Sequence, residues 1–240
     1  MFEVRDLTKV YPGGRGIQGL NLTVRPGEVA ALLGPNGAGK TTALQAMAGW
    51  LTADRGEASW RGDSTLERPD LTRGHMGLMI GEPAPYLYLT GSGYLRLYSK
   101  LYPGIDEARI QQTLELVGMS GHQQLKIRKY STGMKQRIEL ASALLHRPKL
   151  MLLDEPFSGM DIEGRREMTD MLRGLVTETG MSMIISSHQV HEIEDWLTQA
   201  CIIYESKHVD TASIAQIRES FASVEDYYLH CTAREKGGAA

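Results

Sequence analysis

A glycine-rich stretch at residues 34–42 constrains this chain more than any other feature. It matches the pattern G-x-x-x-x-G-K-[ST], in which glycines let the backbone curl so that successive N–H groups face one anion. Its residues are Gly34, Pro35, Asn36, Gly37, Ala38, Gly39, Lys40, Thr41 and Thr42. The apolar run 29–33 predicts a buried strand before this loop, and residues 43–48 predict a helix after it. The alternative interpretation is a glycine turn before an ordinary helix.

The strand–loop–helix context favours a phosphate site, because the N-terminus of the helix adds its positive dipole end to the loop's N–H groups. In that site we expect Lys40 to reach the β- and γ-phosphates of a nucleotide and Thr41 to ligate Mg²⁺.

Two acids follow a second apolar run, at residues 150–153. Asp154 and Glu155 therefore stand at the carboxyl end of a predicted strand, the edge where open α/β sheets bind ligands and where the phosphate loop also leaves its strand. Asp154 is suited to Mg²⁺, directly or through water, and Glu155 to polarising an attacking water as general base. The alternative is a solvated acid pair before Pro156.

Composition narrows the class of protein. The chain has 240 residues, which is enough for one large domain or two small ones. Apolar residues make up 42% of it, so its core needs no disulfide or structural metal for stability. A net charge of −3 gives no global attraction to nucleic acid or anionic lipid. The two cysteines show neither metal spacing nor a disulfide framework, which favours a reducing compartment. We expect neither a signal peptide nor a membrane-spanning helix.

The order of patterns predicts an α/β fold. Residues 2–8 and 19–25 alternate as antiparallel strands do, and residues 92–119 show two helical periodicities split by Pro103 and Gly104. Beyond them we expect a helix over 134–145, a strand over 150–154, a helix over 161–179, a strand over 181–186, a helix over 191–197 and a hairpin over 200–211 that turns through Ser206 and Lys207. The domain prediction is residues 1–220 with a helical subdomain inserted at about 84–145, then a short tail, 221–240, partly disordered over 237–240.

These motifs resemble the nucleotide-binding domain of ABC transporters over roughly residues 1–215. The resemblance rests on five linked segments in the family's order: the phosphate loop, a signature sequence at 130–134, the acidic strand 150–155, a D-loop at 158–161, and a switch histidine, His188. It implies a P-loop NTPase core with a mixed sheet, an N-terminal antiparallel β subdomain and an inserted helical subdomain.

The resemblance also implies roles for further residues. Tyr11 would stack on the adenine of ATP, although a turn tyrosine packed on the surface is the alternative. Ser131 and Gly133 would bind the γ-phosphate held by another subunit, and Asp161 belongs to the D-loop. A lone histidine at a strand end is usually structural, but the position of His188 in the series favours a γ-phosphate contact and a catalytic role beside Lys40 and Glu155.

Two departures from the family pattern stand out. The signature keeps Ser131 and Gly133 but not the family's usual residues at 130, 132 and 134, and this variant resembles export-type subunits grouped with bacitracin and sodium exporters. Gly81 occupies the position of the family's usual glutamine, which touches Mg²⁺ and the attacking water. Either Glu82 makes the contact that the glutamine would make, or it is an ordinary acidic residue of the loop; the sequence favours neither interpretation.

The resemblance implies an ATPase subunit, with ATP and Mg²⁺ as cofactors, that powers a membrane exporter. Two such chains, as a homodimer or a heterodimer, would enclose two ATP molecules while docked on transmembrane permease subunits at the inner face of the cell membrane, with no nucleic acid as partner. The rivals are a non-transport ABC ATPase acting on a soluble machine, and a P-loop kinase, which would leave Ser131 and Gly133 without a role. The sequence does not identify the substrate.

An aromatic segment, residues 83–102, is the predicted docking surface. It holds five of the ten tyrosines, with five leucines, more than one buried helix stripe needs. The alternative is that these side chains pack the core of the helical subdomain itself.

Overall fold

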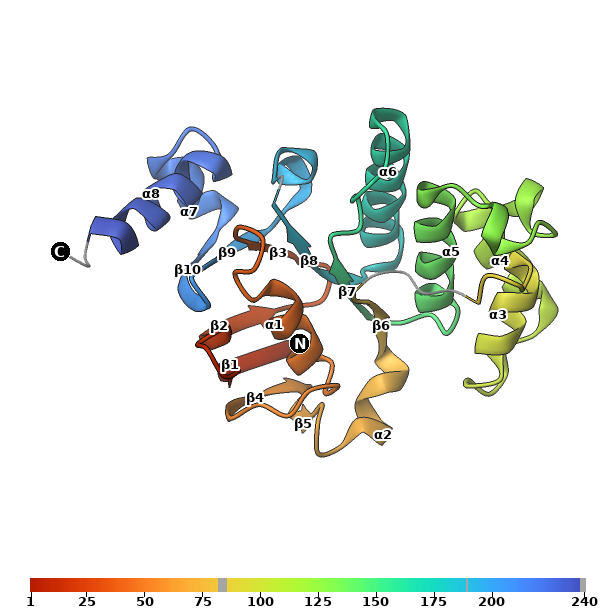
Figure 1. Cartoon of the computed structure of the whole chain (residues 1–240), viewed down its shortest axis with the longest axis horizontal. Helices are drawn as coiled ribbons and strands as arrows, with labels where there is room; N and C mark the ends of the chain where they lie inside the picture. Colours follow the sequence, from red (N-terminus) through yellow and green to blue (C-terminus); the bar gives the residue numbers. More distant parts are fainter. Residues whose placement is uncertain (82–85, 189, 238–240) are drawn as a thin grey trace.

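A computed structural model of the chain describes residues 1–81, 86–188 and 190–237 (Figure 1). Ten strands form one sheet in the order β5-β4-β1-β2-β10-β9-β3-β8-β7-β6. They are β1 (Phe2–Val10), β2 (Gly16–Val24), β3 (Val29–Leu33), β4 (Arg55–Trp60), β5 (Asp63–Ser64), β6 (Met76–Met79), β7 (Leu150–Asp154), β8 (Ser182–Ser187), β9 (Gln199–Tyr204) and β10 (Lys207–Ser213). The helices are α1 (Lys40–Met47), α2 (Pro69–Thr72), α3 (Gly91–Ser99), α4 (Glu107–Leu116), α5 (Thr132–Leu144), α6 (Ile162–Thr179), α7 (Ile214–Ser220) and α8 (Val224–Gly237).

The sheet is mixed, as predicted. Strands β9, β3, β8, β7 and β6 run parallel to one another, whereas β1, β2, β4 and β5 pair antiparallel at the N-terminal end. Strand β10 lies between the two groups, antiparallel to β9 and parallel to β2. All five residues of β3 are buried, as expected for a parallel strand covered on both faces. Val29, Ala31 and Leu33 pack into one core, and Ala30 and Leu32 into the other, because successive side chains of a strand point to opposite faces.

Helices cover the two faces unequally. Helix α1 packs against β1, β2 and β7 in the smaller core, and α3 to α8 contribute to the larger one. Helices α3, α4 and α5 lie at one end of the molecule, and α8 lies at the other (Figure 1). Within the described ranges, no helix has both the length and the apolar character that a bilayer crossing requires.

The helices between β6 and β7 begin at side-chain caps. Thr90, Asp106 and Ser131 accept hydrogen bonds from the N–H groups of Gly93, Arg109 and Met134, at 3.1, 2.8 and 3.2 Å, and so start α3, α4 and α5. The predicted split of this region into two helices before α5 is confirmed. The boundaries of a helical subdomain at 84–145 stay a prediction.

The helix predicted over 191–197 is wrong. Two 3₁₀ turns, Val190–Glu192 and Glu194–Trp196, occupy this stretch. The predicted hairpin is confirmed as β9 and β10, but it turns one residue earlier, at Glu205 and Ser206, which both have positive φ. Helix α8 was not among the sequence expectations, and of the tail expected to be disordered, Gly237 ends that helix while 238–240 lie outside the described residues.

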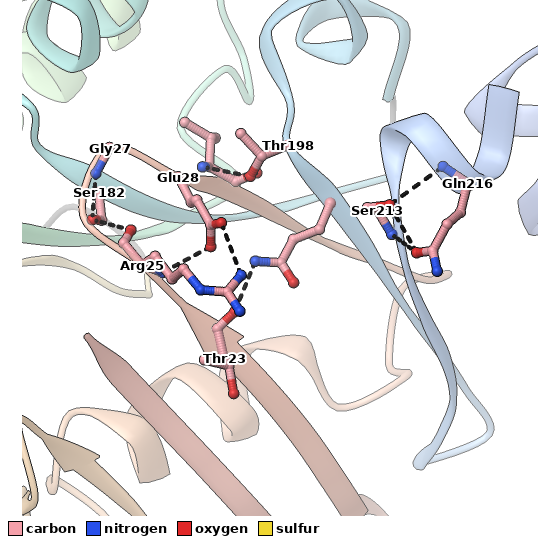
Figure 2. A network of polar contacts seen from close by, with 10 residues as sticks. Thr23, Arg25, Gly27, Glu28, Ser182, Thr198, Ser213 and Gln216 are labelled. Atoms are coloured by element: carbon pink, nitrogen blue, oxygen red, sulfur yellow. Dashed lines mark hydrogen bonds and ion pairs between the residues drawn. The ribbon is translucent and has the colours of Figure 1, made fainter.

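A polar network fixes the start of β3, at the end of the strand remote from the phosphate loop (Figure 2). Ser182 on β8 donates from Oγ to the Arg25 carbonyl at 2.8 Å and accepts from the Gly27 N–H at 3.2 Å. The hydroxyl of Thr198 exchanges hydrogen bonds of 2.9 Å with both backbone groups of Val29. These bonds hold the turn before β3 against its neighbours, so the register of β3 beside β8 is fixed.

Candidate functional site

The loop between β3 and α1 approaches other backbone so closely that it requires glycine. Gly39 has φ +107°, and a Cβ there would meet the Gly16 carbonyl oxygen at 1.8 Å. A Cβ on Gly34 would lie 2.3 Å from the Ile203 carbonyl oxygen. Gly39 is also the N-cap of α1 and offers no capping side chain, so the first N–H groups of α1 are available to an anion at the helix N-terminus.

Lys40 is buried, at 6% exposure, and its ammonium group is fully engaged. Nζ donates to the Gly34 carbonyl at 2.8 Å and to the Pro35 carbonyl at 3.2 Å, and lies 3.3 Å from Oε1 of Glu155. A buried lysine held by loop carbonyls and one carboxylate is a cation poised over the anion site of the loop.

Asp154 ends β7 and Glu155 follows it, and both acids lie beside Lys40 or Thr41, as the sequence predicts. Thr41 donates from Oγ1 to Oδ2 of Asp154 at 2.7 Å. Oε2 of Glu155 lies 2.8 Å from Nδ1 of His188. Three parallel neighbours, β3, β8 and β7, end at this edge, so residues far apart in the sequence converge here.

A cavity of about 310 Å³ opens beside these groups. It is lined by Tyr11, Arg15, Gly16, Asn36, Gly37, Gly39, Lys40, Thr41, Thr42, Asp154 and Glu155. Tyr11 is 38% exposed on its wall, as an adenine-stacking side chain requires. Ala38 is buried in the smaller core and supports the loop from behind.

The other predicted binding residues do not line that cavity. Ser131 is the exposed N-cap of α5, and Asp161 is the N-cap of α6, accepting from the Gly164 N–H at 2.8 Å. Gly133 lies against Met160, whose Cε would be 3.3 Å from a Cβ. A neighbouring cavity of about 470 Å³ is lined by Thr132 and Gly81, together with Thr41, Asp154 and Glu155. Glu82, the candidate replacement for the missing glutamine, lies outside the described residues.

Sequence reasoning did not predict Arg15 and Gly16 on the cavity wall, nor Ser186 behind the two acids. Oγ of Ser186 donates to Oδ1 of Asp154 at 2.5 Å and accepts from the Glu155 N–H at 3.0 Å. A hydroxyl at the end of an apolar strand was the available signal, but its partner depends on the register of β8 beside β7, which pairs Ser186 with Asp154.

The residues present fit a nucleotide and a divalent cation. Lys40 and the free N–H groups of α1 suit phosphates, and Thr41 with Asp154 offers a hydroxyl and a carboxylate, the oxygen donors that Mg²⁺ prefers. Oε1 of Glu155 is buried and forms an ion pair with Lys40 at 3.3 Å, without a hydrogen bond among the described residues.

Comparison with known proteins decides the family. The model of the family described as "ABC transporter" matches residues 17–158. The chain belongs to the ABC transporter family. It is the ATP-binding subunit, an ATPase, and the recognition of the family from sequence is confirmed.

Several relatives are similar over most of their length. An uncharacterized ABC transporter ATP-binding protein of Bacillus subtilis is 36% identical, over 89% of this chain and 70% of that protein. The bacitracin transport ATP-binding protein of Bacillus licheniformis is 33% identical, over 86% and 68%. The lantibiotic transport ATP-binding protein of Streptococcus pyogenes is 32% identical, over 86% and 88%.

Solved structures confirm the fold. An ATP-binding subunit of an ABC transporter has a TM-score of 0.85 and 26% identity, and covers 97% of this chain and 99% of its own. A dimeric ATP-binding cassette bound to ADP and Pi has a TM-score of 0.80 at 20% identity, covering 89% and 99%, which supports the fold alone.

Proposed function

We propose that this subunit powers a membrane exporter by closing a head-to-tail dimer on two ATP molecules while docked on transmembrane permease subunits. The observation that carries the proposal is the separation of Ser131 and Gly133 from the cavity that contains Lys40 in the same chain. An exposed helix N-terminus with a capping hydroxyl suits an anion, and here that anion is the γ-phosphate held by the second subunit. The second subunit is another copy or a related chain.

Within each site, different residues have different roles in phosphoryl transfer. Lys40 and the loop N–H groups neutralise and orient the phosphates, and Tyr11 stacks on adenine. Thr41 and Asp154 hold Mg²⁺, which neutralises charge on the phosphate oxygens when bound. Glu155 accepts a proton from the attacking water, and His188, bonded to Glu155 at 2.8 Å, contacts the γ-phosphate. Asp161 of the D-loop holds the start of α6, next to the signature helix α5, on the surface that meets the second subunit.

The permease contacts a cleft on the side of α3 and α5. This cleft, of about 440 Å³, includes exposed apolar side chains such as Trp50 (54%) and Leu101 (69%). Tyr86 and Tyr88 add further exposed aromatic surface, at 48% and 67%. Large exposed apolar and aromatic groups mark interfaces in soluble proteins. Docking here would place the chain on the cytoplasmic face of the membrane, and its net charge of −3 supports a protein partner over nucleic acid. The bacitracin and lantibiotic transport relatives favour export.

Replacement of Tyr86 and Tyr88 by Ser tests this proposal. We expect ATP turnover of the isolated subunit to stay within about twofold, because these side chains lie outside the nucleotide site and exposed substitutions rarely change the fold. Co-purification with integral membrane subunits from detergent-solubilised membranes should be lost. Leu116→Ser, an exposed leucine (39%) on α4 outside the cleft, is the matched control and should co-purify normally. A wild-type chain that recovers only soluble partners would reject the transport role.

A further inference from the structure

Ser186 is a buried hydroxyl placed between the two acids of the site. It has 0% exposure and follows Met183, Ile184 and Ile185, which are also fully buried, on β8. The register of β8 beside β7 sets it opposite Asp154. A polar group removed from water at this depth is costly unless it is fully hydrogen-bonded.

The hydroxyl of Ser186 donates one hydrogen bond to Asp154 and accepts another from Glu155. As a donor, Oγ of Ser186 bonds Oδ1 of Asp154 at 2.5 Å, while Thr41 bonds the other oxygen, Oδ2, at 2.7 Å. Each oxygen of Asp154 therefore has its own hydroxyl donor, on opposite sides of the carboxylate. This arrangement fixes the rotation of the carboxylate and directs Oδ2 toward Thr41, the other predicted Mg²⁺ ligand.

As an acceptor, the same hydroxyl holds the backbone of Glu155. The Glu155 N–H donates to Oγ of Ser186 at 3.0 Å and to the Ser186 carbonyl at 3.2 Å. Glu155 has φ +46°, a left-handed conformation that is strained for a residue with a side chain and persists only where its surroundings impose it. That backbone turn sends the carboxylate toward Lys40, at 3.3 Å, and His188, at 2.8 Å.

We propose that Ser186 is a positioning residue for ATP hydrolysis: one hydroxyl orients Asp154 toward the Mg²⁺ site and holds Glu155 in its left-handed turn. It acts through these two acids and does not itself touch nucleotide. The inference rests on the ATPase assignment and on the roles proposed for Asp154 and Glu155. Removal of hydrogen-bonding partners behind metal ligands typically costs about 10–100-fold in metal affinity or activity.

The test compares Ser186→Thr with Ser186→Val. Both side chains are β-branched, suit a strand and have nearly the same volume, so they strain the packing equally and differ in the hydroxyl alone. The readouts are kcat, and the ratio of the Kd for a fluorescent ATP analogue in EDTA to that in excess Mg²⁺. The ratio reports the contribution of Mg²⁺ to binding and needs no turnover.

The hydroxyl-bearing variant should keep both readouts within about threefold of wild type. Ser186→Val should lose about tenfold in kcat and about tenfold in the Mg²⁺ ratio, with the Kd in EDTA unchanged. If Ser186→Val fails to fold, the smaller Ser186→Ala takes its place with the same expectations.

Ser182→Val is the matched control, because Ser182 is a buried, doubly hydrogen-bonded serine at the remote end of the same strand (Figure 2). It should lower the melting temperature and leave the Mg²⁺ ratio unchanged. Equal behaviour of the Thr and Val variants in both readouts would overturn the proposal. A loss of binding by Ser186→Val that is as large in EDTA as in Mg²⁺ would also overturn it. A wild-type protein with no ATPase activity would instead reject the proposed function.

Discussion

At the scale of single residues, the contacts of Glu155 connect the phosphate loop to the end of β8. Glu155 lies between Lys40 and His188, and Lys40 also donates to two loop carbonyls. Phosphate oxygens compete with these acceptors for the ammonium group of Lys40 because they carry more charge. We therefore expect bound nucleotide to draw Lys40 away from Glu155, the proposed general base.

Outside the nucleotide site, burial shifts the pKa of His146. His146 stacks on Tyr102, with ring centroids 4.1 Å apart, and its Nε2 lies 3.0 Å from the Met76 carbonyl oxygen. Burial lowers the pKa of His146, and the charges of Arg109 and His75 act in the same direction. The folded state therefore takes up this proton at lower pH than the unfolded state, whose histidine pKa is about 6.5. Stability from His146 is present above about pH 6.5 and is lost as the pH falls below it.

The prediction concerns thermal unfolding between pH 7.5 and pH 5.5. His146→Gln keeps an amide that can donate to the Met76 carbonyl but does not titrate. Its melting temperature should fall less than that of wild type over this range. Comparison with wild type removes the contributions of other groups, including Glu139, whose pKa is raised by burial, and His208, whose pKa is lowered by it. Identical pH profiles for the two proteins would contradict the assignment.

The phosphate loop and the strand-final acids were predictable from sequence because each is a local pattern, whereas His188 was singled out only by its place in the order of the family's motifs. Lys40, Thr41, Asp154, Glu155 and His188 do converge, as that interpretation required. Ser186 was not predictable, because its importance depends on which residue of β7 lies beside it. A register between strands separated by a helix is a tertiary property.

At the scale of elements, the described side chains of the aromatic segment, residues 83–102, lie partly in the core and partly on the surface. Tyr94 and Leu95 are fully buried, so part of the segment does pack the helices' own core, as the alternative interpretation held. Leu101 (69% exposed) and Tyr88 (67%) face outward instead. The sequence could not assign each leucine to one surface, because apolar residues fill more than one stripe of the helical pattern.

Leucines on the two surfaces should respond differently to truncation. Leu95→Ala should lower the free energy of unfolding by about 2–5 kcal/mol, because it leaves a cavity in the larger core. Leu101→Ala should change it by less than about 0.5 kcal/mol but weaken co-purification with the membrane subunits. Urea denaturation of both variants, followed by the co-purification assay, checks this. Similar destabilisation by the two variants would show that Leu101 also packs the core.

The stretch around residues 190–197 shows where periodicity misleads. Val190, Ile193 and Leu197 have helical spacing and are buried, yet the backbone forms two 3₁₀ turns. The side chain of Glu194 in this stretch accepts a hydrogen bond from the Val224 N–H at the start of α8, at 2.9 Å. Helix α8 itself carries a capping serine, Ser223, which accepts from the Asp226 N–H at 3.0 Å, so its start was visible in the sequence.

At the scale of the whole molecule, the proposed ATP-dependent dimer depends on where Ser131 and Gly133 lie relative to Lys40. The cavity beside Lys40 lacks Ser131 and Gly133, which lie at the start of α5. In the proposed dimer, a two-fold arrangement of two chains would supply each cavity with the signature helix of the other, and such a pairing would close without further growth. Dimer formation should therefore require nucleotide in the site.

The most direct measurement is light scattering of Glu155→Gln with MgATP. This variant should hydrolyse ATP about 10²–10⁴-fold more slowly and still bind it, so the closed dimer should accumulate at twice the mass of one chain. Lys40→Ala, which loses the cation that holds the phosphates, should stay monomeric under the same conditions. A Glu155→Gln variant that binds MgATP yet remains monomeric at every protein concentration, or that dimerises equally without nucleotide, would contradict the proposed ATP-dependent dimer.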